Sequence, residues 1–288
     1  MIFQKEVITI AEQKGVLKST IDKDWVLGHF LGAIYSESKL REVLIFKGGT
    51  CLKKCWFPDY RFSEDLDFTS KDSAFELKQS HLDFICWHVK ENASILSQVE
   101  SLNPLLFKDK LTGYEAVIRF WGSDHPKNEP PPPSDRWHTK IKIEITLYEK
   151  LIFEQTERKL IHSYSDQLAL NPNAIPCYVI EEMLSEKLRS LIQRSYTAPR
   201  DYYDIWYLAN NIKDLNWPKI VEAFHEKMKF KGHKFTGIDQ LINDDNDKKL
   251  KGAWKNSMGH QVNESQLPEY ELVKENLSLL FNKLFDRA

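Results

Sequence analysis

The chain has 288 residues, of which 42% are hydrophobic and 28% are charged. This composition is that of an ordinary globular protein, and the length allows one large domain or two smaller ones with an ample core. The formal net charge is −2. A general electrostatic attraction to nucleic acid is therefore excluded, and any such contact must come from a local basic patch.

The four cysteines, at positions 51, 55, 86 and 177, are too few and too scattered to predict a disulfide framework or a zinc site. We interpret Cys51 and Cys55, one helical turn apart, as small packing residues, with a pair of metal ligands as the less favoured alternative. No signal peptide is expected at the start, and no apolar run approaches the ~18 residues of a membrane span. We therefore expect a cytoplasmic protein without a membrane partner.

The first 67 residues predict the order helix, helix, strand, helix, strand. Asp24 is expected to cap the amphipathic helix that follows it. The apolar run 43–46 predicts a strand, and the Gly48-Gly49-Thr50 sequence after it predicts a turn that opens a short helix. Backbone N–H groups at such a turn can hold a triphosphate.

Asp65 and Asp67 follow on the next predicted strand. Alternate side chains share one face of a strand, so the two carboxylates project the same way, about 7 Å apart. A divalent cation would offset their repulsion, and Mg²⁺ favours a few carboxylates together with phosphate oxygens. Taken alone, each motif has an ordinary explanation, a simple turn or a solvated strand end. Their order is the layout of the nucleotidyltransferase signature and favours nucleotide chemistry.

Beyond the signature, we expect a long helix over 73–97 and strands between about 104 and 148. The clearest strand patterns cover 114–120 and 139–147. Between them stand four consecutive prolines, which cannot donate to a sheet ladder and predict a polyproline II connection joining two antiparallel strands. We favour an idle surface loop for this segment over a docking site for a partner.

Glu144 lies on the polar face of the 139–147 strand. If this strand lies beside the strand of Asp65 and Asp67, Glu144 could supply a third carboxylate. A salt bridge on a wet sheet face is the favoured alternative on pattern alone.

After about residue 178 the sequence becomes helical. The fold class that we predict is α+β, with a mixed sheet and flanking helices followed by a helical C-terminal region. We expect two domains, 1–170 and 171–288. The predicted helices of the second cover 179–194, 199–210, 217–230, 238–257 and 269–286.

Lys187 falls on the apolar stripe of the 179–194 helix. A lysine on a buried face needs a counter-charge, unless its ammonium reaches the surface. A phosphate or the acidic cluster could supply that charge. Asp201, just after Pro199, could be merely a carboxylate favoured at a helix start. Asp204 faces inward, and a buried ion pair between Lys187 and Asp204 is the structural alternative for both residues.

Taken together, five segments resemble the AbiEii-like toxins, the family that holds the toxin components of abortive-infection AbiE systems and the MenT toxins. The resemblance spans roughly 40–210, and its most specific part is Arg-Phe-Ser-Glu-Asp-Leu-Asp-Phe at 61–68. The segments occur in the order of that family, at 47–50, 60–68, 142–145, 182–188 and 200–206.

The resemblance implies a nucleotidyltransferase core of the DNA polymerase β type and a toxin of a toxin–antitoxin system. Such an enzyme transfers a nucleoside monophosphate from an NTP to an acceptor hydroxyl, with one or two Mg²⁺ ions. The expected acceptor is the 3′ end of tRNA, or another RNA, and a cognate antitoxin protein is the expected partner.

The resemblance also implies roles for particular residues. Gly48, Gly49, Thr50, Ser63 and Lys187 would contact the nucleotide. Asp65, Asp67 and Glu144 would hold metal, and Asp201 or Asp204 would complete a catalytic set made with Asp65, Asp67 and Lys187. Ser63 matches a serine that in some members accepts a phosphoryl group from a kinase antitoxin. Threonine replaces the usual serine at position 50, and a Glu at position 144 makes a one-metal site possible.

Two other functions stay open. The fold could bind a nucleotide or a protein partner without transfer, or transfer the nucleotide to a small molecule. Arg189, Arg194 and Arg200 could form a basic edge for an RNA backbone. A solvated helix face explains these arginines equally well.

Overall fold

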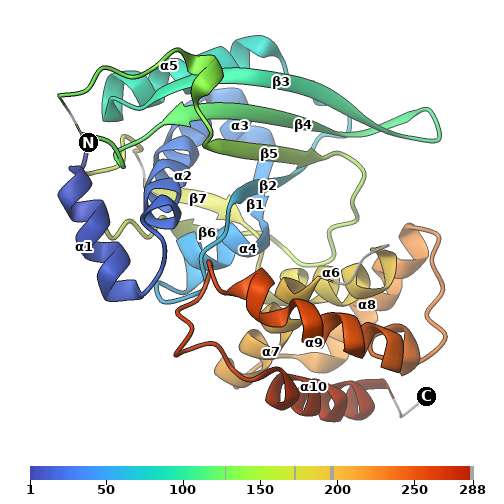
Figure 1. The fold of residues 1–288 in the computed structure, drawn as a ribbon. Helices are drawn as coiled ribbons and strands as arrows, with labels where there is room; N and C mark the ends of the chain where they lie inside the picture. The colour runs from blue at the N-terminus through green and yellow to red at the C-terminus, as the bar shows by residue number, and fades with distance from the viewer. Residues whose placement is uncertain (127, 172, 195–197, 286–288) are drawn as a thin grey trace. The chain divides into compact units, whose positions relative to one another are not determined.

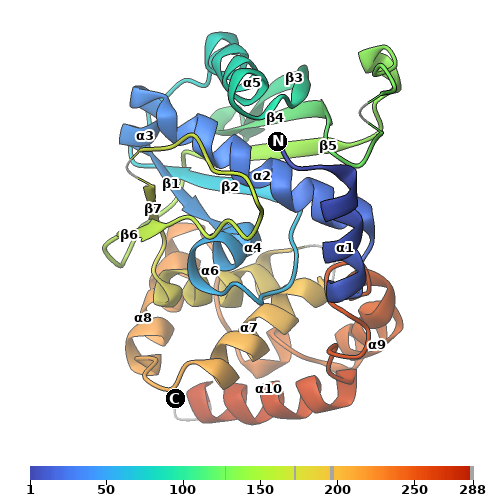
Figure 2. The same cartoon turned by 90° about the vertical axis from the view of Figure 1, so that its left-hand side faces the viewer.

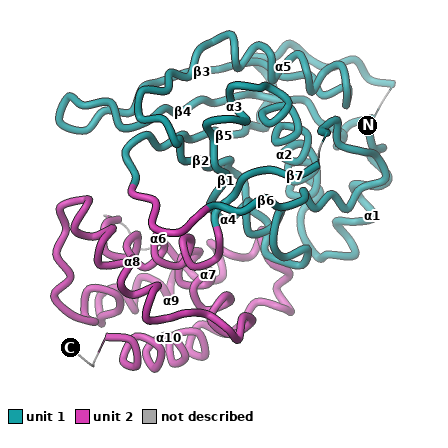
Figure 3. The backbone as a smooth tube through the Cα atoms, turned by 180° about the vertical axis from the view of Figure 1, so that it is seen from behind, with its two compact units in different colours: residues 1–149, 155–178 teal, residues 150–154, 179–288 magenta. Residues whose placement is uncertain are grey.

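A computed structural model describes residues 1–126, 128–171, 173–194 and 198–285 of the chain. The chain forms two compact units, which are coloured separately in Figure 3. The first unit comprises Met1–Glu149 and Gln155–Tyr178, and the second comprises Lys150–Glu154 and Val179–Ala288. The folding domains predicted to divide at residue 170 stay a prediction.

A mixed sheet forms the centre of the first unit (Figure 1). In the described residues its strand order is β3-β4-β5-β2-β1-β7-β6. The β2–β5 and β1–β7 pairs are parallel and the other neighbours are antiparallel, which confirms the predicted α+β class. The strands are β1 (Leu44–Lys47), β2 (Asp65–Ser70), β3 (Leu96–Phe107), β4 (Lys110–Trp121), β5 (Lys140–Thr146), β6 (Thr156–Lys159) and β7 (Ala174–Cys177).

One face of this sheet is apolar because strand side chains alternate between faces. Leu66, Phe68, Ile143 and Ile145 are at most 2% exposed, and each such buried side chain contributes about 1.5–3 kcal/mol to stability. Tyr35 of α2 places its ring 6.1 Å from that of Phe68. The opposite face is therefore the one that carries the acidic residues of β2.

Helical segments that precede β3 in the chain complete this part of the first unit. Figure 2 shows α2 crossing the sheet and α5 beside β3. The segments are α1 (Gln4–Lys14), α2 (Lys18–Ser36), α3 (Ser38–Val43), α4 (Gly48–Cys51), a π-helical turn (Leu52–Trp56) and α5 (Gln79–Ala93).

Two local predictions in this unit are wrong. The helix expected over 73–97 is only α5, because Ser94 adopts a left-handed conformation with φ 55° and β3 begins directly after it. Pro104 lies within β3, and β3 is at the edge of the sheet, where a proline is tolerated. Asp24 is not a helix cap, since α2 begins at Lys18 and buries Asp24 in its interior.

The proline-rich segment joins β4 to β5, which are antiparallel as predicted. A short 3₁₀ turn, Ser134–Arg136, follows the prolines.

The second unit is helical in its described residues, close to the predicted ranges. A buried ion pair between Glu182 and Lys227, 2.6 Å long, joins two of its helices. Glu182 also accepts hydrogen bonds from the backbone N–H groups of Ile152 and Phe153, which holds Lys150–Glu154 in this unit. The helices are α6 (Ile180–Gln193), α7 (Pro199–Asn211), α8 (Trp217–Phe230), a 3₁₀ turn (Ile238–Gln240), α9 (Asp244–Met258) and α10 (Tyr270–Phe285).

Among the helices of the described chain, none has both the length and the apolar composition needed to cross a membrane.

Candidate active site

The glycine turn forms where the sequence predicts it, directly after β1, and its residues begin α4. Gly48 has a φ of +81°, and a Cβ at this position would lie 2.4 Å from a carboxylate oxygen of Asp67. A Cβ on Gly49 would lie 2.8 Å from the Arg61 guanidinium and 3.0 Å from the Ser63 hydroxyl oxygen. The left-handed backbone favours glycine at position 48, and a side chain at position 49 would displace Arg61 or Ser63. The turn is thereby packed against one predicted metal ligand and one predicted nucleotide contact.

Thr50 fastens this turn to the next strand. Its hydroxyl donates to the backbone oxygen of Asp65 over 2.5 Å, and the residue is 1% exposed. A contact between Thr50 and a nucleotide would accordingly come from its backbone N–H rather than from its hydroxyl.

The carboxylates of β2 lie beside β5. The register places Asp67 opposite Glu144 and Asp65 opposite Lys142 on the parallel neighbour, so the condition that the two strands lie side by side is met. Lys142 also pairs with Glu144 at 3.2 Å. Glu144 therefore shows both expected features, a place next to Asp67 and an ion pair on the polar sheet face.

The electrostatic field at Asp67 disfavours its charged form. Burial raises the pKa of Asp67, and the negative charges of Glu144 and Asp65 raise it further. Lys47, opposite Asp67 on β1, and Lys142 oppose this shift. The resulting pKa is about 6. A bound divalent cation would stabilise the ionised carboxylate and remove much of this penalty.

The donor set suits a metal held by few protein ligands. In the described part of the chain, Asp65, Asp67 and Glu144 do not form a group whose ligand oxygens all lie within 4.8 Å of one another. Two carboxylates that share a cation with phosphate oxygens are the arrangement that Mg²⁺ favours. The residues therefore fit a hard cation that arrives with a nucleotide better than a closed metal cage.

Three charged residues of this site were missed by our sequence analysis. Arg61, 5% exposed, packs against Gly49 and could offset phosphate charge. Lys47 is buried at the end of β1, and Glu115 on β4 lies opposite Glu144. Arg61 belongs to the most specific string of the resemblance, so its position carried a signal; Glu115 could be found only from the strand register.

Lys187, Asp201 and Asp204 lie in the second unit, where they form a cluster of their own. The Lys187 ammonium is 2.5 Å from Asp204 and 3.4 Å from Asp201. Asp204 is fully buried. The alternative of a buried ion pair between two helices is thus confirmed. Their expected catalytic roles stay a prediction.

The three arginines considered for RNA contact differ in exposure. Arg189 is 5% exposed and donates a hydrogen bond to Gln193. Arg194 is exposed and lies 3.0 Å from Asp201. Arg200 is half-buried near the start of α7. An RNA backbone could reach Arg194 and Arg200 more readily than Arg189.

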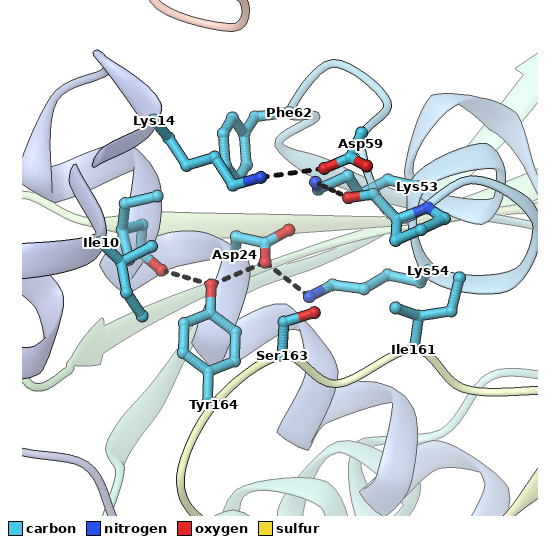
Figure 4. A pocket seen from close by; sticks show the side chains of 12 residues that line it. Ile10, Lys14, Asp24, Lys53, Lys54, Asp59, Phe62, Ile161, Ser163 and Tyr164 are labelled. Atoms are coloured by element: carbon cyan, nitrogen blue, oxygen red, sulfur yellow. Dashed lines mark hydrogen bonds and ion pairs between the residues drawn. The ribbon is translucent and has the colours of Figure 1, made fainter. Parts of the chain in front are cut away.

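A pocket lined in part by lysines lies elsewhere in the first unit, and our sequence analysis did not predict it (Figure 4). The cavity measures about 90 Å³. Lys54 is paired with Asp24 at 2.7 Å, and Tyr164 donates to the same carboxylate. Burial lowers the pKa of Lys53 to about 8, and its ammonium donates to the Pro58 carbonyl. The ammonium groups of Lys53 and Lys54 are therefore both engaged by oxygen atoms of the protein.

Solved structures of low sequence identity share this fold. MenT4, a nucleotidyltransferase toxin from Mycobacterium tuberculosis H37Rv, is 17% identical with a TM-score of 0.63, over 96% of this chain and 88% of that one. JHP933 from Helicobacter pylori is 15% identical with a TM-score of 0.55, over 93% of each chain. No functionally curated protein matches the sequence.

The family described as "Nucleotidyl transferase AbiEii toxin, Type IV TA system" matches residues 29–276. The match covers most of the chain, including the glycine turn, the β2 carboxylates and the Lys187 cluster. The protein therefore belongs to the AbiEii nucleotidyltransferase toxins of toxin–antitoxin systems.

Proposed function

We propose that the protein transfers a nucleoside monophosphate from an NTP to a hydroxyl of an RNA acceptor, with the tRNA 3′ end as the favoured acceptor and Mg²⁺ as the metal. The observation that carries this proposal is the packing of the glycine turn against Asp67, with Glu144 opposite Asp67 on the adjacent strand. The turn that we propose to bind phosphate and the carboxylate that we propose to bind the cation thus lie against each other.

In the first unit, the proposed phosphate-binding groups and the proposed metal-binding groups differ in charge. Backbone N–H groups of the Gly48–Cys51 turn and the Arg61 guanidinium would bind the anionic triphosphate. Asp65 and Asp67, with Glu144 beside them, would hold Mg²⁺. The bound metal would stabilise charge on the attacking and leaving oxygens during displacement of pyrophosphate. Removal of one such stabilising group typically costs a factor of about 10²–10³ in rate.

Ser63 has a position that suits regulation by a kinase antitoxin. Its hydroxyl oxygen lies against Gly49 and the residue is half-buried. A phosphoryl group on Ser63 would add about 1.5–2 negative charges beside the carboxylates. It would compete with the triphosphate for the turn, and transfer would stop. We propose that a cognate antitoxin acts in the cytoplasm, by this modification or by binding.

The test uses the full chain with each of the four α-labelled NTPs, Mg²⁺ and total tRNA. We expect label on RNA with at least one nucleotide, and loss of the signal when the tRNA 3′ hydroxyl is oxidised beforehand. Label that appears only on a small molecule would mean that the acceptor is a small molecule and not RNA. Tight nucleotide binding without any transfer, across all four nucleotides and added small-molecule acceptors, would refute the proposal.

A further inference from the structure

Three cysteines meet in the core of the first unit. Cys51 ends α4, Cys55 lies in the π-helical turn and Cys177 ends β7. Their sulfur atoms all lie within 4.8 Å of one another, and the residues are 0%, 2% and 0% exposed. The remaining cysteine, Cys86, lies apart on α5. The structure thus brings together three cysteines that our sequence analysis described as scattered.

The spacing suits a thiolate-ligated metal ion. Zinc–sulfur bonds of about 2.3 Å place the sulfurs of a tetrahedral or trigonal site roughly 3.8–4.0 Å apart, which falls within the 4.8 Å limit that the three sulfurs satisfy. Among the described residues the group contains sulfur ligands alone, which select soft ions such as Cu⁺ and Zn²⁺. Three ligands complete a trigonal Cu⁺ site and leave Zn²⁺ one further position.

Rigid elements hold the three ligands. Cys51 and Cys55 are on one continuous helical segment that begins at the glycine turn. Cys177 is paired with Phe46 of β1, and the next N–H, of Tyr178, donates to the Phe46 carbonyl over 3.0 Å. Ligands on paired strands and helices move little, so the site is organised before a metal arrives.

A basic side chain balances the charge. Three thiolates with Zn²⁺ carry one net negative charge, which is costly in a core. Arg158 donates from Nε to the Cys55 carbonyl over 3.2 Å, and its guanidinium lies 4.3 Å from the Trp56 ring centre. All three cysteines bind such an ion as thiolates, so metal uptake releases their protons.

We propose that Cys51, Cys55 and Cys177 bind one thiophilic d¹⁰ cation, Zn²⁺ or Cu⁺, which fastens the helix behind the glycine turn to β7. The site differs from that of the hard catalytic metal in its ligands, and it does not depend on the reaction. Its structural effect is a cross-link within the first unit that holds the Gly48–Cys51 turn against the sheet.

The test measures metal binding by the full-length protein under reducing conditions. Purified chain is stripped with a chelator and titrated separately with Zn²⁺ and Cu⁺ against a competing chromophoric chelator, and bound metal is counted by mass spectrometry. We expect one equivalent of one ion per chain. Co²⁺, used as a probe for the zinc site, should give thiolate-to-cobalt charge-transfer absorption.

Matched variants locate the site. Cys86→Ala should bind as the wild type does, whereas Cys51→Ala and Cys177→Ala should bind at least tenfold more weakly and lose the cobalt absorption. Circular dichroism establishes that each variant is folded. A wild-type chain that holds neither Zn²⁺ nor Cu⁺ and gives no cobalt–thiolate band would overturn the proposal, whatever the variants do. Undiminished binding by folded Cys177→Ala would overturn it as well.

Discussion

Replacing Gly48 by alanine tests the contact between the glycine turn and the carboxylates. A left-handed backbone costs an L-residue about 1–2 kcal/mol. The added Cβ would also lie 2.4 Å from the Asp67 oxygen, and overpacking of this kind costs about 1–3 kcal/mol more. We therefore expect Gly48→Ala to lower the free energy of unfolding by about 2–5 kcal/mol and to push the Asp67 carboxylate from its place.

Two other glycines separate these contributions. Gly232 has a φ of +74° and nothing within 4 Å of an added Cβ, so Gly232→Ala should show the backbone cost alone. Gly252, inside α9, has ordinary φ and open space. Gly252→Ala should stabilise its helix by up to about 1 kcal/mol.

The assay is urea denaturation for stability, with calorimetric titration of Mg²⁺ and a non-hydrolysable NTP for function. Gly48→Ala should weaken metal–nucleotide binding at least tenfold, whereas the other two variants should bind normally. If Gly48→Ala loses no more stability than Gly232→Ala and binds metal–nucleotide like the wild type, then Asp67 does not depend on the turn and our account of the site is wrong.

Three further predictions concern buried charges. Asp24→Asn leaves the Lys54 ammonium buried without its partner carboxylate and should lower the free energy of unfolding, measured by urea denaturation, by about 3–5 kcal/mol. The Asp24→Asn/Lys54→Met double variant should lose less stability than the sum of the two single losses, and strict additivity would contradict the ion pair. Burial raises the pKa of Asp22 to about 7, so the folded chain keeps a proton that the unfolded chain loses near 3.8, and stability falls as pH rises between these values. Asp22→Asn should remove this loss, so its stability relative to the wild type should rise by roughly 2–3 kcal/mol between pH 5 and 7. A stability difference between the two proteins that stays constant over that pH range would refute the raised pKa of Asp22. Lys187→Met should destabilise the chain by about 3–5 kcal/mol because Asp204 loses its counter-charge. The double variant Lys187→Met/Asp204→Asn should recover most of the lost stability in the same assay. If the double variant also recovers transfer activity, Lys187 has a structural role alone.

The part of the site predicted from sequence is the part built by neighbours in the chain. A strand, two glycines and an Asp-x-Asp pair follow one another closely, so alternation along a strand and the conformational needs of glycine predict their arrangement. The sequence analysis placed Glu144 beside them only on the condition that the two strands are neighbours, because the sequence of a strand does not reveal which strand pairs with it.

The features that escaped prediction depend on distant partners. Aspartate is a residue type that commonly caps helices, and only its ion pair with the buried Lys54 ammonium explains why Asp24 lies inside α2 instead. Cys177 joins Cys51 and Cys55 through the β1–β7 pairing, which spacing along the chain does not reveal. The helix expected over 73–97 was drawn past Ala93 because the sequence pattern revealed neither the left-handed conformation of Ser94 nor the pairing of β3 with β4.

The carboxylates of β2 are central to the proposed metal-dependent nucleotidyl transfer. The most direct test of their role is the rate of pyrophosphate release from an NTP in a single turnover with the acceptor present. Asp67→Asn should slow release by about 10²–10³ while its melting temperature stays at or above that of the wild type. Asp109→Asn, at the exposed tip of the β3–β4 hairpin, should release pyrophosphate at the wild-type rate. Release by folded Asp67→Asn within tenfold of the wild type would contradict the account.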